Sequence, residues 1–86
     1  MESIWVAVLH ISDATAAKII GKHNITPTEV RDAVVCVSEL PFRWDAHAEH
    51  GLRAVVTATI RGFEVALVLY PLGDDTWNLG SAYQLS

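Results

Sequence analysis

The tetrapeptide Ile60-Arg61-Gly62-Phe63 constrains the fold more strongly than any other part of this chain. A two-residue turn with glycine at its second central position is typical of a tight β-hairpin, because glycine adopts positive φ at no steric cost. Apolar runs flank the turn on both sides, over residues 52–60 and 63–70. If Ile60 pairs with Phe63, the register of two long antiparallel strands follows from that one pair.

This register divides the two strands into an apolar face and a mixed face. The apolar face is expected to lie against helices, and it consists of Leu52, Ala54, Val56, Ala58, Ile60, Phe63, Val65, Leu67 and Leu69. On the other face Thr59 lies opposite Glu64, and Arg53 lies opposite Tyr70. An arginine and a tyrosine are therefore predicted to meet on the side of the sheet away from the helices.

The segment KHNITPTEV, residues 22–30, predicts the end of one helix and the start of another. Thr26 is a suitable N-cap, Pro27 fits the first helical position, and Glu29 can complete a capping box. We expect a helix from Pro27 to about Val37. An earlier helix over residues 13–23 is expected to begin at Ser12 or Asp13, to end at Asn24, and to turn Ala16, Ile19 and Ile20 inward.

Strands are also expected over residues 3–12 and 76–85, which are rich in β-branched and aromatic residues. Residues 38–51 are expected to form a long, functional loop in which Trp44 is available to a partner. The sequence thus predicts one α+β domain over residues 1–86. Its expected order is β-α-α-β-β-β, with an antiparallel sheet and both helices on one face.

The remaining histidines and the cysteine give weaker signals. His47 and His50 are spaced as His-x-x-His, which could bind zinc if the segment were helical, but no second ligand pair accompanies them. We therefore expect neither a metal nor a cofactor. His10 is expected in or beside the core, and Cys36 is expected to be a buried apolar residue.

Charge bears on partners and location. The formal net charge of −4, with no basic region, disfavours nucleic-acid binding. No lysine or arginine precedes Lys18, so the basic start of a signal peptide is missing. The apolar stretch of residues 54–72 is interrupted by Arg61, Gly62 and Glu64, which indicates two strands and not a membrane span. We expect a cytoplasmic protein.

Two segments resemble BrnT-type toxins, which are small ribonucleases of the RelE superfamily found in bacterial toxin–antitoxin pairs. They are SDATAAKIIGKHNITPTEV and LRAVVTATIRGFEVALVLYPLGDDTWNLGSA, and the resemblance extends from about residue 8 to residue 83. It implies a RelE-like fold, a metal-independent endoribonuclease activity that blocks translation, a cognate antitoxin, and RNA or the ribosome as target. The chain departs from the family pattern at Asn24, where the family has glycine, and at Tyr83, where it has arginine.

The resemblance and the strand register together nominate the site residues. Cleavage at a 2′-hydroxyl needs a base, an acid and donors to the phosphate, and histidine, arginine and tyrosine can fill these roles. The candidate catalytic residues are Lys22, His23, His50, Arg53 and Tyr70, and the candidate substrate contacts are Arg61, Ser81 and Tyr83.

Simpler interpretations of these residues stay open. His23 can be a helix-end residue bonded to backbone carbonyls, and Arg53 can be a solvated arginine packed over Tyr70. A second function is then a non-catalytic relative of the toxins that binds a protein or forms a homodimer through its exposed sheet. Tyr83 and the acidic charge favour this alternative.

Overall fold

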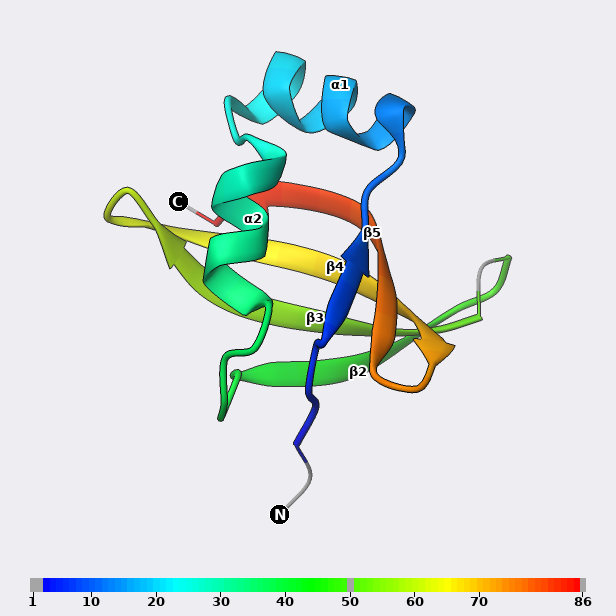
Figure 1. Ribbon diagram of the computed structural model, residues 1–86. Coiled ribbons are helices and arrows are strands. Elements are labelled where there is room, and N and C mark those ends of the chain that lie inside the picture. Colours follow the sequence, from blue (N-terminus) through cyan, green and yellow to red (C-terminus); the bar gives the residue numbers. More distant parts are fainter. Residues whose placement is uncertain (1–2, 50, 86) are drawn as a thin grey trace.

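The computed structural model describes residues 3–49 and 51–85 and shows one mixed sheet with both helices on the same side (Figure 1). The elements are β1 (Val8–His10), α1 (Asp13–His23), α2 (Pro27–Val34), β2 (Phe42–His47), β3 (Gly51–Ile60), β4 (Phe63–Gly73) and β5 (Thr76–Gln84). The strand order is β1-β5-β4-β3-β2, in which β1 is parallel to β5 and the other pairs are antiparallel. The α+β class is confirmed, whereas the predicted all-antiparallel sheet of four strands is wrong.

The central hairpin has the predicted register. Ile60 pairs with Phe63, and the pairing continues without a shift to Ala54 and Leu69. Arg61 and Gly62 in the turn both have positive φ, of 51° and 82°. This combination is the one that a type I′ turn requires, and its twist matches the twist of the strands that it joins.

The helix junction also follows the sequence. The side chain of Ser12 accepts from the N–H of Thr15 at the start of α1, and Asn24 ends that helix in the left-handed conformation. Thr26 and Glu29 form the capping box of α2. This helix ends at Val34 and not near Val37, because Val35 is already extended and bridges to Val6. In the described part of the chain, no helix has the length and apolar character needed to cross a membrane.

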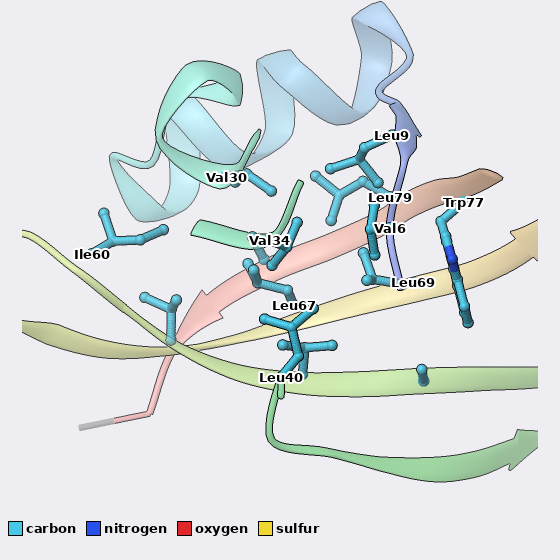
Figure 2. Close-up of a cluster of buried hydrophobic side chains, with 14 of the residues drawn as sticks. Val6, Leu9, Val30, Val34, Leu40, Ile60, Leu67, Leu69, Trp77 and Leu79 are labelled. Atoms are coloured by element: carbon cyan, nitrogen blue, oxygen red, sulfur yellow. The ribbon is translucent and has the colours of Figure 1, made fainter. Parts of the chain in front are cut away.

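The core lies between the helices and one face of the sheet. Figure 2 shows Val30 and Val34 of α2 directed toward Leu67 and Leu69 of β4. Of the apolar residues predicted on this face of the hairpin, Leu52 and Phe63 are exposed because they lie at the ends of the strands. The prediction that Ile20 points inward is wrong: α1 buries only Ile19, and Ile20 remains 48% exposed.

The largest correction concerns the predicted loop of residues 38–51, which contains the edge strand β2. Phe42 pairs with Val56 of β3, and the pairing runs to His47 and Gly51. Trp44 is half-buried and stacks on Trp77 with ring centroids 6.2 Å apart, so it is not a free loop residue.

Three smaller predictions are also wrong. The first strand extends only from Val8 to His10 and not over residues 3–12, because β5 begins at Thr76, the partner of Val8, and α1 begins at Asp13. His10 and Cys36 are both exposed and lie outside the core. His10 follows the buried Leu9 on a short edge strand, and Cys36 follows the end of α2 with a φ of 58°.

Candidate site on the open sheet face

Three side chains from neighbouring strands meet on the side of the sheet away from the helices, here called the open face. Asp45 of β2 is the cross-strand partner of Arg53 of β3, and the hairpin register places Tyr70 of β4 on the other side of Arg53. The Nε of Arg53 donates to Oδ2 of Asp45 over 2.8 Å, and its Nη2 lies 2.7 Å from the same oxygen. Its Nη1 donates to the Tyr70 hydroxyl over 3.4 Å. The predicted meeting of Arg53 and Tyr70 is confirmed.

The charge of Arg53 is compensated within this cluster. The Tyr70 hydroxyl and the Asp45 carboxylate both accept from the guanidinium, and these bonds raise the pKa of Arg53 above its ordinary value. Arginine recognises phosphate by presenting two nitrogens of its planar fork. Two of the nitrogens of Arg53 are already directed at Asp45, so a phosphate would have to displace a carboxylate.

Glycine at position 80 allows the Tyr70 ring to approach β5 closely. A Cβ atom at this position would lie 2.3 Å from Cε2 of Tyr70, well inside van der Waals contact. On the other side of β5, the Nζ of Lys18 donates to the Gly80 carbonyl over 3.1 Å. Gly80 is therefore the position at which the backbone of β5 supports the tyrosine of the cluster.

An apolar floor extends from this cluster along the open face. Val55, Ala66 and Val68 are only 6%, 2% and 5% exposed, although both helices lie on the opposite side of the sheet. Their burial must come from the side chains around them. Ser81 and Tyr83, which were predicted as substrate contacts, pair with Val68 and Ala66 and lie half-buried beside this floor.

The candidates Lys22, His23 and Arg61 lie in a different part of the molecule. Arg61 is paired with Glu29 over 2.7 Å and also donates to the carbonyl of Asn24, the residue after His23. This contact places the end of α1 beside the β3–β4 turn. Arg53 is eight residues away from Arg61 along β3, a separation of about 25 Å at ~3.3 Å per residue. The predicted site that combines Lys22 with Arg53 is therefore not assembled.

The histidine candidates give no site in the described residues. His50 lies outside them, and His47 belongs to a strand and not to the helix that a His-x-x-His zinc site would need. Within residues 3–49 and 51–85, no group of three or more His, Cys, Asp or Glu residues could hold a metal ion. The same residues include no fully buried polar or charged side chain.

A shallow hollow of about 240 Å³ lies on the helix side, between α2 and the β3–β4 turn. It is lined by Glu29, Asp32, Ala33, Thr59, Ile60 and Arg61. Glu29 is engaged by Thr26 and Arg61, and the Thr26 backbone N–H is the main cause that lowers the pKa of this carboxyl. The ion pair between Glu29 and Arg61 thus links the helix junction to the β3–β4 turn.

Asp45 is the residue of the cluster that the sequence reasoning missed. The alternation of Phe42, Trp44 and Ala46 with charged residues was a signal for a strand. With β2 assigned, the pairing of Asp45 with Arg53 would have followed.

In the comparisons with known proteins, the chain matches no family model, no curated protein and no solved structure.

Proposed function

We propose that this cytoplasmic chain is a RelE/BrnT-like relative of the toxins whose function is to bind a small protein partner of the antitoxin kind through its open face. The observation that carries the proposal is that the guanidinium of Arg53 is already bonded to Asp45 and Tyr70. Its fork is directed at Asp45, and Arg61, which contacts Asn24 at the end of α1, is about 25 Å from Arg53 along the sheet. The groups that RNA cleavage would need do not converge in the described residues, and this supports a binding role.

The composition of the open face supports binding of a protein. Arg53, Tyr70 and Tyr83 are half-buried and remain accessible, and they lie around Val55, Ala66 and Val68, which neighbouring side chains already cover. Arginine and tyrosine are enriched at protein interfaces. The formal net charge of −4 is also unfavourable for a surface that must hold a phosphate backbone.

The experiment uses two matched substitutions of exposed threonines. Thr57 lies on the open face opposite Ala66, and Thr28 lies on α2 on the other side of the molecule. The protein encoded by the adjacent reading frame is titrated against the full chain by calorimetry. We expect Thr57→Arg to weaken binding at least tenfold and Thr28→Arg to leave it unchanged. Equal affinity of both variants and the original chain would refute the open face as the binding surface.

A metal-independent endoribonuclease that blocks translation is the second candidate, and the meeting of Arg53 with Tyr70 on an uncovered face favours it. RNA is incubated with the purified chain, with and without ribosomes, and growth is followed on expression. Cleavage and growth arrest that are both lost in Arg53→Ala would establish this function. Intact RNA together with normal growth would exclude it.

A further inference from the structure

The outer edge of β2 is an unpaired strand edge with a self-complementary sequence. β2 is the last strand of the sheet, and no backbone–backbone hydrogen bond among the described residues joins its outer side to another segment. We infer that this edge pairs with β2 of a second copy of the chain, in antiparallel orientation about a two-fold axis at Trp44. The dimer would contain one continuous sheet across both copies.

The hydrogen bonds of β2 define which backbone groups are available for this pairing. The N–H of Thr57 donates to the carbonyl of Pro41 over 3.0 Å, so residues 41 and 57 are a hydrogen-bonded pair. Such pairs alternate along an antiparallel ladder. Arg43 and Asp45 therefore direct their backbone groups toward β3, while Phe42, Trp44 and Ala46 direct theirs toward the free edge. Only registers that match these outward residues with one another can form a ladder between two copies.

Charge selects one register from those that the backbone permits. With the axis at Trp44, Arg43 lies opposite Asp45 of the second copy, and Asp45 lies opposite Arg43 of the second copy. A slide of the second strand by two residues in one direction sets Arg43 against Arg43, and a slide in the other direction sets Asp45 against Asp45. Like charges directly opposite each other destabilise a strand pair, whereas opposite charges stabilise it. The usual effect of charged residues, which discourage pairing of an exposed edge, is thus reversed in this one register.

The side chains of Arg43 and Asp45 are available for that contact. Arg43 is 66% exposed, and its nearest acidic group is Oδ1 of Asp45 in the same chain at 3.9 Å, beyond hydrogen-bond distance. Arg53 contacts the other oxygen, Oδ2. The Oδ1 atom of Asp45 can therefore accept from Arg43 of the second copy while the Asp45–Arg53 contact is kept.

The other face of β2 is also complementary in size. In the same register Phe42 lies opposite Ala46 of the second copy, so a large side chain faces a small one. Leu52 is the β3 partner of Ala46 and is 53% exposed, although it belongs to the apolar face of the sheet. Phe42 of the second copy would extend over Ala46 toward Leu52. Trp44, which stacks on Trp77, would lie beside its own equivalent at the axis.

The first test is the mass of the full chain in solution, by light scattering and sedimentation velocity. We expect a species of twice the 9.4 kDa chain mass. Ala46→Pro removes an outward N–H without touching the β2–β3 hydrogen bonds, and Ala46→Ser keeps that N–H. We expect Ala46→Pro to be monomeric and Ala46→Ser to remain dimeric. A monomeric original chain at millimolar concentration, or a dimer that persists in a folded Ala46→Pro variant, would overturn the inference.

Two further measurements do not depend on tolerance of the proline. Arg43→Gln removes the attraction and Arg43→Glu adds repulsion, so we expect the dimer dissociation constant to rise in that order, by about tenfold or more for Arg43→Glu. In a Cys36→Ser background, Arg43→Cys mixed with Asp45→Cys should form a disulfide-linked heterodimer that neither variant forms alone, because paired strands bring such positions within disulfide range. Unchanged dissociation constants, or no cross-link in the mixture, would refute this register. The measurements need no partner protein, so their outcome is independent of the proposed function.

Discussion

The contact between Gly80 and Tyr70 predicts that the effect of Gly80→Ala on the free energy of unfolding changes sign when the tyrosine ring is removed. An alanine Cβ at position 80 would lie 2.3 Å from the tyrosine ring, so the ring must move by about 1 Å to restore ordinary contact. Overpacking of this kind costs about 1–3 kcal/mol. For a domain of this size that corresponds to a fall in Tm of roughly 4–8 °C for each kcal/mol.

Removal of the ring should reverse the effect. The φ angle of Gly80 does not lie in the left-handed region, so an alanine can adopt its backbone conformation. In a Tyr70→Ala background, Gly80→Ala should therefore be neutral or stabilise the fold by about 0.5–1 kcal/mol, because alanine is less flexible than glycine in the unfolded chain.

The assay is urea unfolding of the four proteins in this double-mutant cycle, followed by circular dichroism. The double variant is expected to be more stable, by at least about 1 kcal/mol, than the sum of the two single effects implies. Additive effects of Gly80→Ala and Tyr70→Ala would show that the ring does not pack on β5 as described. Thr57→Ala, on the same face but away from Gly80, is the control, and it should show no coupling.

Three more predictions concern stability. Leu67→Ala should cost about 2–5 kcal/mol because the side chain is fully buried, whereas the exposed Leu52→Ala should change the monomer by less than about 0.5 kcal/mol; denaturant titration of both variants under monomeric conditions checks the contrast. Thr26→Ala should cost about 1 kcal/mol through loss of the N-cap, measured as a lower urea midpoint, and Thr26→Ser should restore it. The pKa of Glu29 is lowered in the folded chain, so its contribution to stability is present above its ordinary value of 4.5 and is lost as pH falls through the folded-state value. Between pH 4.5 and that folded-state value, stability should fall less steeply with decreasing pH in Glu29→Gln than in the original chain, and identical pH profiles would contradict the assignment.

The parts of the fold that sequence could predict are those that depend on local chemistry. The turn at Gly62 determined the hairpin register, and Thr26 with Glu29 determined the start of α2. These features arise from residues only a few positions apart, so their physical causes can be read directly from the chain. The meeting of Arg53 with Tyr70 was predictable because it follows from the register that this local turn sets.

The features that were missed depend on distant partners. The alternation of Phe42, Trp44 and Ala46 with charged residues indicated a strand, but its place at the sheet edge depends on pairing with β3. The parallel pairing of β1 with β5 joins residues 68 positions apart, for example Val8 with Thr76, and no local pattern marks it. Lys22 and Arg53 are not brought together because the helix junction contacts the β3–β4 turn, whereas Arg53 lies near the opposite end of β3.

The pairing of β1 with β5 has a consequence for the order in which the molecule assembles. Closing so long a connection costs more conformational entropy than closing the two-residue turn of the hairpin. On a chain that emerges from the ribosome amino end first, β1 and α1 must wait for the strand that completes their half of the sheet. Folding should therefore spread from the β3–β4 pair outward, and the earliest residues to be synthesised should be among the last to become ordered.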